Sequence, residues 1–228
     1  MSCILCIETT STNCSVALAR VDGGYQNSYS INHCLDLLEN NSDQYLHGEQ
    51  LHVFIDDILK RNELTPQDLA AVAISKGPGS YTGLRIGVSS AKGLCYALDI
   101  PLIAIDTLTA LSLQDLSETK FVIPFLDARR MEVYASVFEN GREVVGPNAV
   151  VLDESSFLRF RESGTTSFIG TGIRKFEELL PFSNDVNFTQ ALPTALTMCD
   201  MAIDQMKIGN TVDVAYFEPF YLKDFKVG

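Results

Sequence analysis

The chain has 228 residues, 46% of them hydrophobic and 20% charged, which is typical of a globular protein long enough to bury a substantial core. Its net charge of −12 argues against a protein that binds nucleic acid on its own, because an acidic surface repels phosphate. The first residues include no basic region, and no apolar run reaches the ~18 residues of a membrane span. The sequence therefore predicts a cytoplasmic protein without a membrane segment.

Alternating strand and helix patterns predict an α/β protein in two parts, residues 1–118 and 119–228. In the first part, apolar runs indicate strands at 3–8, 14–19, 25–31, 69–75 and 101–105. Helical spacing indicates helices at 48–61 and 81–98, a short helical turn at Pro66 and a further helix capped by Asp106. Residues 35–46 fit neither pattern. The second part shows strands at 121–126, 132–138 and 168–170, and helices near 172–180 and 194–207.

Cysteine and histidine spacing gives no support for a metal site. Cys3 and Cys6 form a C-x-x-C, but they lie in a predicted strand, where residues three apart point to opposite faces. The favoured interpretation is two small core residues. The six cysteines are not expected to form a disulfide framework, since no secretory signal is present. His47 and His52 are five apart, which separates them by ~140° around a helix, so no zinc site is predicted.

A glycine-rich segment runs from Ser75 to Gly87 into the predicted helix 81–98. Glycines before a helix can bring backbone amides close to an anion, but the P-loop pattern is absent, and a tight turn followed by a helix start is the simpler interpretation. The helix has one apolar stripe and a second stripe of mostly small residues, Gly83, Gly87, Ser90, Leu94 and Ala97. That second side could pack against the first helix of the same chain or against a partner.

A second charged segment follows the strand predicted at 121–126. Asp127, Arg129 and Glu132 cluster there, which usually indicates a solvated turn with a local ion pair, although a functional role stays open. The G-x-G at Gly170 to Gly172 is weak evidence for any site.

Six segments in order resemble the TsaB (YeaZ) family, whose members serve the synthesis of threonylcarbamoyladenosine in tRNA. They are Ile7-Glu8-Thr9-Thr10-Ser11, His47-Gly-Glu49-Gln-Leu51, Gly77-Pro-Gly-Ser-Tyr-Thr-Gly-Leu-Arg85-Ile-Gly87, Asp127-Ala-Arg129 with Glu132-Val-Tyr134, Gly170-Thr-Gly172, and Glu218-Pro-Phe-Tyr-Leu222. The resemblance implies the actin/Hsp70/sugar-kinase-like fold, which is ribonuclease H-like: two linked α/β domains, here with the second one reduced.

The resemblance also implies that the chain has no catalytic site and binds no metal. The catalytic sister family, TsaD, has a His-x-x-x-His metal pair after the strand that follows the glycine-rich helix. The matching positions here are Thr107 and Leu111, whose hydroxyl and isobutyl groups cannot replace imidazole ligands. Nucleotide-using members of the fold usually have Asp at the position of Glu8, so the loop of Glu8, Thr9, Thr10 and Ser11 is interpreted as the remnant of a phosphate loop, and no cofactor is expected.

Function is then expected to come from association. The resemblance implies that the two helices of the first domain bind TsaD directly, through His47, Leu51, Ile55, Tyr81, Leu84, Arg85, Gly87 and Val88. TsaE is expected to complete the complex, tRNA to be contacted mainly through these partners, and the free chain to form a homodimer. Two alternative functions remain. One is a small ATP-dependent kinase or ATPase of the same fold, which the presence of Glu8 in place of Asp disfavours. The other is a metallopeptidase, which the missing histidine pair disfavours.

Overall fold

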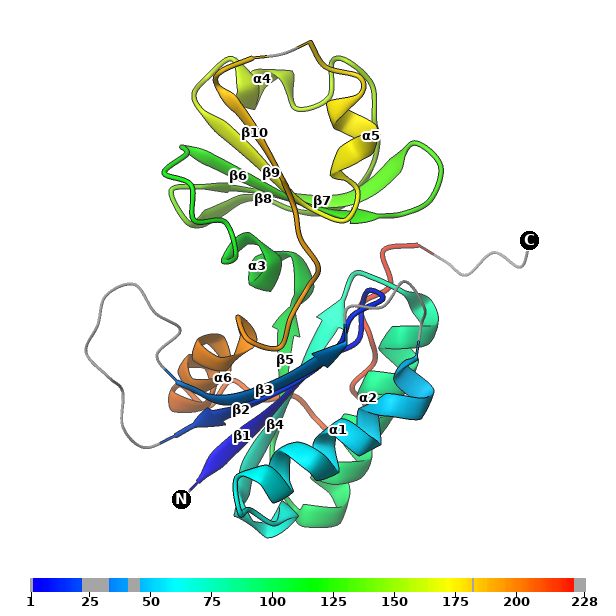
Figure 1. Ribbon diagram of the computed structural model, residues 1–228, viewed down its shortest axis with the longest axis vertical. Helices are drawn as coiled ribbons and strands as arrows, with labels where there is room; N and C mark the ends of the chain where they lie inside the picture. The colour runs from blue at the N-terminus through cyan, green and yellow to red at the C-terminus, as the bar shows by residue number, and fades with distance from the viewer. Residues whose placement is uncertain (1, 22–32, 41–45, 182, 224–228) are drawn as a thin grey trace.

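A computed structural model describes residues 2–21, 33–40, 46–181 and 183–223. Two five-stranded sheets lie one above the other, with a short helix between them (Figure 1). The first sheet has the order β3-β2-β1-β4-β5, formed by β1 (Cys3–Glu8), β2 (Cys14–Arg20), β3 (Cys34–Asn40), β4 (Leu69–Gly77) and β5 (Leu102–Asp106). The second has the order β10-β9-β6-β7-β8, formed by β6 (Phe121–Asp127), β7 (Glu132–Glu139), β8 (Arg142–Val151), β9 (Thr166–Gly170) and β10 (Val186–Gln190).

The centre of the first sheet is buried on both faces. β1 pairs antiparallel with β2 and parallel with β4, and all six of its residues are buried. Cys3 belongs to the core cluster beneath one helix layer, whereas Cys6 belongs to the cluster on the opposite face. The prediction that these cysteines are core residues on opposite faces is confirmed, and the described cysteines are free thiols.

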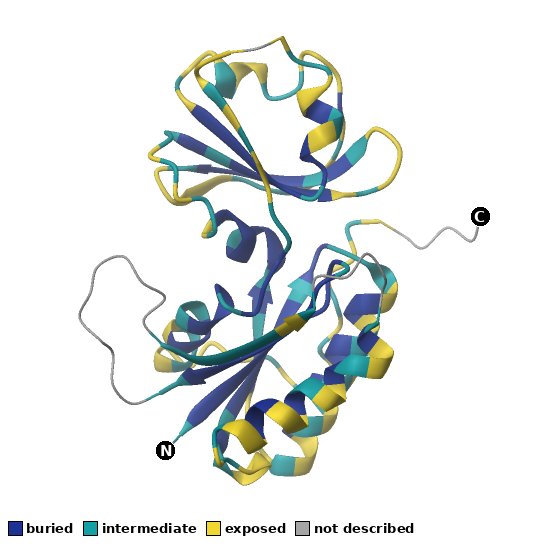
Figure 2. Cartoon of the chain, in the orientation of Figure 1, coloured by how far each residue is buried: buried dark blue, intermediate teal, exposed yellow. Residues whose placement is uncertain are grey.

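Helices α1 (His47–Arg61) and α2 (Tyr81–Leu98) cover one face of the first sheet, as their apolar spacing predicted (Figure 1). The short η1 (Pro66–Asp68) follows α1. α2 begins where the Ser80 hydroxyl accepts a hydrogen bond from the amide of Gly83 at 3.3 Å, and it ends at Asp99 in a left-handed conformation. Its apolar stripe of Leu84, Val88, Ala91 and Cys95 is buried, and its opposite face is exposed (Figure 2).

A short helix, α3 (Thr107–Ser112), joins the two sheets. Asp106 caps it as predicted, since its carboxylate accepts a hydrogen bond from the amide of Thr109 at 3.1 Å. Leu108 and Leu111 of α3 pack with Leu126 of the second sheet in one cluster. The layer between the sheets is therefore apolar.

The second sheet contains the predicted strands β6, β7 and β9, with α4 (Leu158–Arg161) and α5 (Ile173–Glu177) against it. Its core is aromatic: the ring centroids of Phe125 and Phe168 lie 5.3 Å apart, and those of Phe168 and Phe176 lie 5.0 Å apart. The strand prediction missed β8 and β10, which are the two edges of the sheet. Edge strands bury less of their surface, so their apolar alternation is weaker.

In the first half, one strand was missed by the sequence analysis, and one predicted strand lies outside the described residues. β3 occupies residues that the sequence left unassigned, and most of its side chains are only half-buried. The strand predicted at 25–31 lies outside the described residues.

The chain returns to the first sheet after completing the second. Helix α6 (Met198–Lys207) buries Met198, Cys199 and Ala202 against Cys6 of β1, on the sheet face opposite α1 and α2. The boundary between residues 118 and 119 lies between the two sheets along the chain and stays a prediction, but α6 packs with the first part. Among the described residues, no helix is long and apolar enough to cross a membrane.

Candidate functional site

The loop after β1 is built around a buried carboxylate. Glu8 is fully buried, and its Oε1 accepts hydrogen bonds of 2.5 Å from both the amide and the hydroxyl of Thr10. Its Oε2 has no partner within the described part of the chain. Burial raises the pKa of the Glu8 carboxyl above its ordinary value, while the hydrogen bonds from Thr10 offset part of this effect. Glu8 is therefore directed at its own loop.

The glycine-rich loop before α2 lies directly on this first loop. The amide of Ser80 donates to the carbonyl of Thr10 at 2.7 Å, and the hydroxyl of Thr9 donates to the carbonyl of Gly83 at 2.8 Å. A Cβ on Gly83 would collide with the Thr9 carbonyl oxygen, and one on Gly87 with the Thr9 hydroxyl. These two glycines of the small-residue stripe thus pack inside the chain, in contact with the first loop.

His47 supports the same loop from α1. It is buried, and its Nε2 lies 2.8 Å from the carbonyl oxygen of Ser11. Burial lowers the pKa of the imidazole below its ordinary value. His47 is therefore a structural neighbour of the loop in this conformation, not a surface group.

Most of the predicted partner-binding residues lie inside the chain. Six are buried: His47, Leu51, Ile55, Leu84, Gly87 and Val88. Leu51, Ile55 and Val88 pack in the core cluster between the helices and the first sheet. Only Tyr81, which is half-buried, and Arg85, which is exposed, reach the surface. The buried residues can shape a partner-binding face only by holding α1 and α2 in place.

The outer face of α1 and α2 carries exposed residues that are not among the predicted partner-binding residues. Val53 is 53% exposed and Tyr96 is 86% exposed. His52 and Ser90 join the helices, with Nε2 of the imidazole 3.2 Å from the hydroxyl oxygen. A Cβ on Gly93 would meet no atom within 4 Å. These exposed positions recur at helical spacing, which was the signal available in the sequence.

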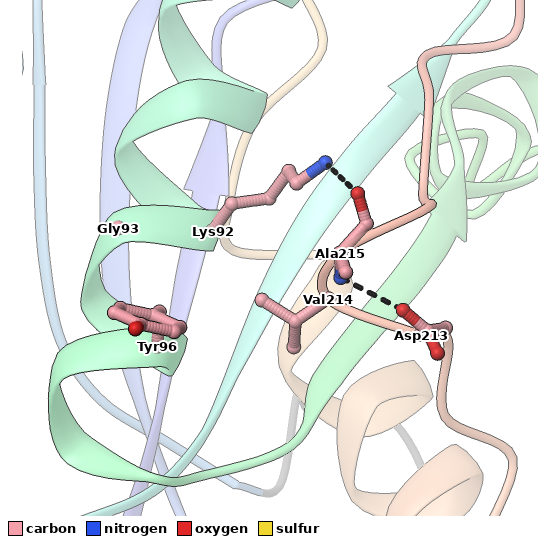
Figure 3. A pocket seen from close by; sticks show the side chains of 6 residues that line it. All are labelled: Lys92, Gly93, Tyr96, Asp213, Val214 and Ala215. Atoms are coloured by element: carbon pink, nitrogen blue, oxygen red, sulfur yellow. Dashed lines mark hydrogen bonds between the residues drawn. The ribbon is translucent and has the colours of Figure 1, made fainter.

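A hollow of about 580 Å³ opens beside α2, lined by Lys92, Gly93, Tyr96, Asp213, Val214 and Ala215 (Figure 3). The Lys92 ammonium donates hydrogen bonds to the carbonyls of Ala215 at 3.1 Å and Phe217 at 2.9 Å. Lys92 thereby ties the C-terminal segment to the flank of α2.

The acids of the charged turn after β6 pair with lysines far along the chain, not with the arginines of the turn as the local ion pair predicted from composition would require. Asp127 Oδ1 lies 2.7 Å from the ammonium of Lys175 and accepts a hydrogen bond from the amide of Arg129 at 2.6 Å. The amide of Asp127 donates to the hydroxyl of Thr171 at 2.9 Å, which links the turn to the G-x-G segment. Arg129 and Arg130 both have positive φ angles and are exposed.

Comparison with known proteins identifies the family of this chain. Residues 42–212 match the family model described as TsaD, tRNA N6-adenosine threonylcarbamoyltransferase. A protein of Haemophilus influenzae named tRNA threonylcarbamoyladenosine biosynthesis protein TsaB is 28% identical, over 97% of this chain and 93% of its own length. The Escherichia coli protein of the same name is 29% identical, over 97% and 94%. The chain belongs to the TsaB (YeaZ) family.

Solved structures of TsaB-like proteins show the same fold. A Pseudomonas aeruginosa structure titled as YeaZ has a TM-score of 0.76 and 24% identity, and it covers 97% of this chain and 100% of its own. An uncharacterized protein described as similar to peptidase YeaZ from Pseudomonas aeruginosa has a TM-score of 0.81, also with 24% identity. The predicted actin/Hsp70/sugar-kinase-like fold is confirmed.

The two positions at which the family resemblance implies metal ligands in TsaD, Thr107 and Leu111, hold packed side chains in this chain. Thr107 is buried, and its hydroxyl accepts a hydrogen bond from the amide of Gly77 at 3.2 Å. Leu111 is buried in the apolar layer between the sheets. Across the described ranges, no group of three or more His, Cys, Asp or Glu side chains could hold a metal ion.

Two glycines of α2 provide a matched test of the close approach to the first loop. Gly83→Ala should lower the free energy of unfolding by about 1–3 kcal/mol, because the Thr9 backbone would have to move. Gly93→Ala should raise it by about 0.5–1 kcal/mol, because its Cβ points into open space and alanine favours the helix. Urea denaturation measures both values. Equal effects of the two substitutions would contradict the proposed packing.

Glu8 should make stability depend on pH. Since the folded-state pKa is raised above the unfolded value, the folded protein binds more protons between the two pKa values, and the free energy of unfolding falls as pH rises through that window. Glu8→Gln removes this titration. Its stability relative to the wild type should therefore increase as pH rises from about 4 toward neutrality. Denaturation curves at several pH values test this, and a difference that does not change with pH would refute it.

Proposed function

We propose that this chain is a non-catalytic subunit that binds and activates TsaD in the synthesis of threonylcarbamoyladenosine next to the tRNA anticodon. The single observation that carries the proposal is the pair Thr107 and Leu111, packed in the core where the catalytic sister family has its metal-binding histidines. A family member without these ligands serves the pathway through a partner. In this proposal the chain works in the cytoplasm.

The outer face of α1 and α2 is the proposed surface for TsaD. It presents exposed Val53 and Tyr96 on two helices that the buried residues Leu51, Ile55 and Val88 hold against the first sheet. An exposed aromatic ring on a rigid helix is a good anchor for a partner, because little conformational entropy is lost on binding. The same face could pair two copies of the free chain in an isologous dimer.

The charge of the chain supports indirect contact with tRNA. With a net charge of −12, the chain as a whole repels a phosphate backbone, so TsaD and TsaE would supply the basic contacts. ATP would likewise be used by other members of the complex. Within this chain, the Glu8 carboxylate is directed at Thr10, and the two adjoining loops are hydrogen-bonded to each other.

Substitutions on the helix face should separate binding from folding. Tyr96→Glu or Val53→Glu should weaken binding of TsaD at least tenfold, because each would place a carboxylate in an interface without a partner. Leu116→Glu is the matched control, since Leu116 is 92% exposed and lies outside these helices. Calorimetric titration with TsaD from the same organism measures the affinities, and melting curves check folding.

Two results would contradict this assignment. If folded Tyr96→Glu and Val53→Glu proteins bind TsaD as tightly as the wild type, the interface lies elsewhere. If the wild-type chain does not bind TsaD, the proposed function itself fails. Leu51→Glu is unsuitable for this purpose, because Leu51 is buried in the core and its substitution would change folding.

A further inference from the structure

The last described segment of the chain, residues 212–223, contacts β5, the glycine-rich loop before α2 and the second sheet. We call it the C-terminal strap. The amide of Val212 donates to the carbonyl of Leu102 at the edge of β5 at 2.9 Å. Further along, the amide of Phe220 donates to the carbonyl of Lys76 at 2.7 Å, beside the glycine-rich loop. Its final described residue, Lys223, forms an ion pair with Glu132 of the second sheet. The strap is therefore anchored along its length.

Near its end, the strap reaches the exposed side of α2. The ring centroids of Tyr221 and Tyr81 lie 5.0 Å apart at an interplanar angle of 39°. The guanidinium carbon of Arg85 lies 4.5 Å from the centroid of the same Tyr81 ring. Tyr81 is thus in contact with the strap through Tyr221 and with the next turn of α2 through Arg85. A ring held by a neighbouring ring offers a fixed platform for a guanidinium.

The Arg85 guanidinium has hydrogen-bond donors that are unpaired within the described part of the chain. Its side chain is exposed, and within the described part of the chain it makes no ion pair or hydrogen bond. α2 contains no acidic residue, and its other cation, Lys92, is engaged with the strap carbonyls. Arg85 is therefore the charged group that α2 presents outward, on a chain whose net charge is −12. Its complement is a carboxylate, which a guanidinium can bind through two parallel hydrogen bonds.

We propose that Arg85 binds a carboxylate of TsaD, and that Tyr81 and Tyr221 hold the guanidinium in the orientation that this contact requires. The proposal rests on the proposed function, because it concerns the same helix face and the same partner. It makes the C-terminal strap a positioning element of the interface. Tyr221 contributes by limiting the conformations of Arg85 through Tyr81, so less conformational entropy is lost when the partner binds.

A double-mutant cycle tests this coupling. Affinity for TsaD is measured for the wild type, Arg85→Ala, Tyr221→Ala and the double variant. We expect Arg85→Ala to weaken binding about tenfold and Tyr221→Ala about three- to tenfold. The double variant should be weaker than Arg85→Ala by no more than about twofold, because Tyr221 acts through Arg85.

Conservative variants show whether the geometry or only the charge matters. Arg85→Lys keeps the charge but loses the paired donors, and it should weaken binding about fivefold. Tyr221→Phe keeps the ring and should bind as the wild type does. Tyr216→Ala is the control within the strap, since Tyr216 is 85% exposed, and it should leave the affinity unchanged.

Three outcomes would overturn the proposal: wild-type affinity in Arg85→Ala, wild-type affinity in folded Tyr221→Ala, or effects of the two substitutions that simply add. Each of these requires that the wild type binds TsaD. Failure of the wild type to bind would instead contradict the proposed function, so the two failures can be told apart.

Discussion

The backbone of α2 lies against the loop that follows β1, and the arrangement of the helices on the first sheet depends on this contact. Gly83 and Gly87 leave room for Thr9, whose hydroxyl bonds back to the helix at Gly83. The loop is in turn held by Glu8, which accepts two hydrogen bonds from Thr10. Because the helix sits this close, its apolar stripe reaches the central strands, and only its outer face is left for a partner.

The first loop, which the family resemblance interprets as the remnant of a phosphate loop, and the glycine-rich loop beside it are thus used for packing. The glycine-rich loop does not stand open beside the first loop; the amide of Ser80 donates directly to the Thr10 carbonyl. The same use is found at Thr107, whose hydroxyl accepts a backbone hydrogen bond at the position where the family resemblance implies a histidine ligand in the sister family. Residues at chemically important positions of the fold serve structure here, and this is consistent with a subunit that acts by association.

Much of the fold could be predicted because local signals agreed with packing. The bounds of α2 followed from the glycine-rich break before Tyr81 and from apolar spacing, and Asp106 marked the start of α3. The strand β3 was missed because its residues are half-buried and alternate weakly, and β8 and β10 were missed because they are sheet edges. Such strands depend on neighbours that lie far away in sequence.

The candidate site was harder to predict, for a geometric reason. Periodicity identifies an apolar stripe but does not say whether the stripe meets the sheet or a partner, so residues such as Leu51 and Val88 were assigned to the surface that they support from beneath. The contact between Tyr81 and Tyr221 joins residues 140 positions apart, and no local pattern predicts it.

The most direct measurement is the amount of threonylcarbamoyladenosine formed in a reconstituted reaction. It contains tRNA, ATP, TsaD, TsaE and the other components of the pathway, with or without this chain. The account predicts modified tRNA only when the chain is present, and no ATP hydrolysis by the chain alone. Equal modification without the chain, or enzyme-like ATP turnover by the isolated chain that is lost in Glu8→Ala, would contradict it.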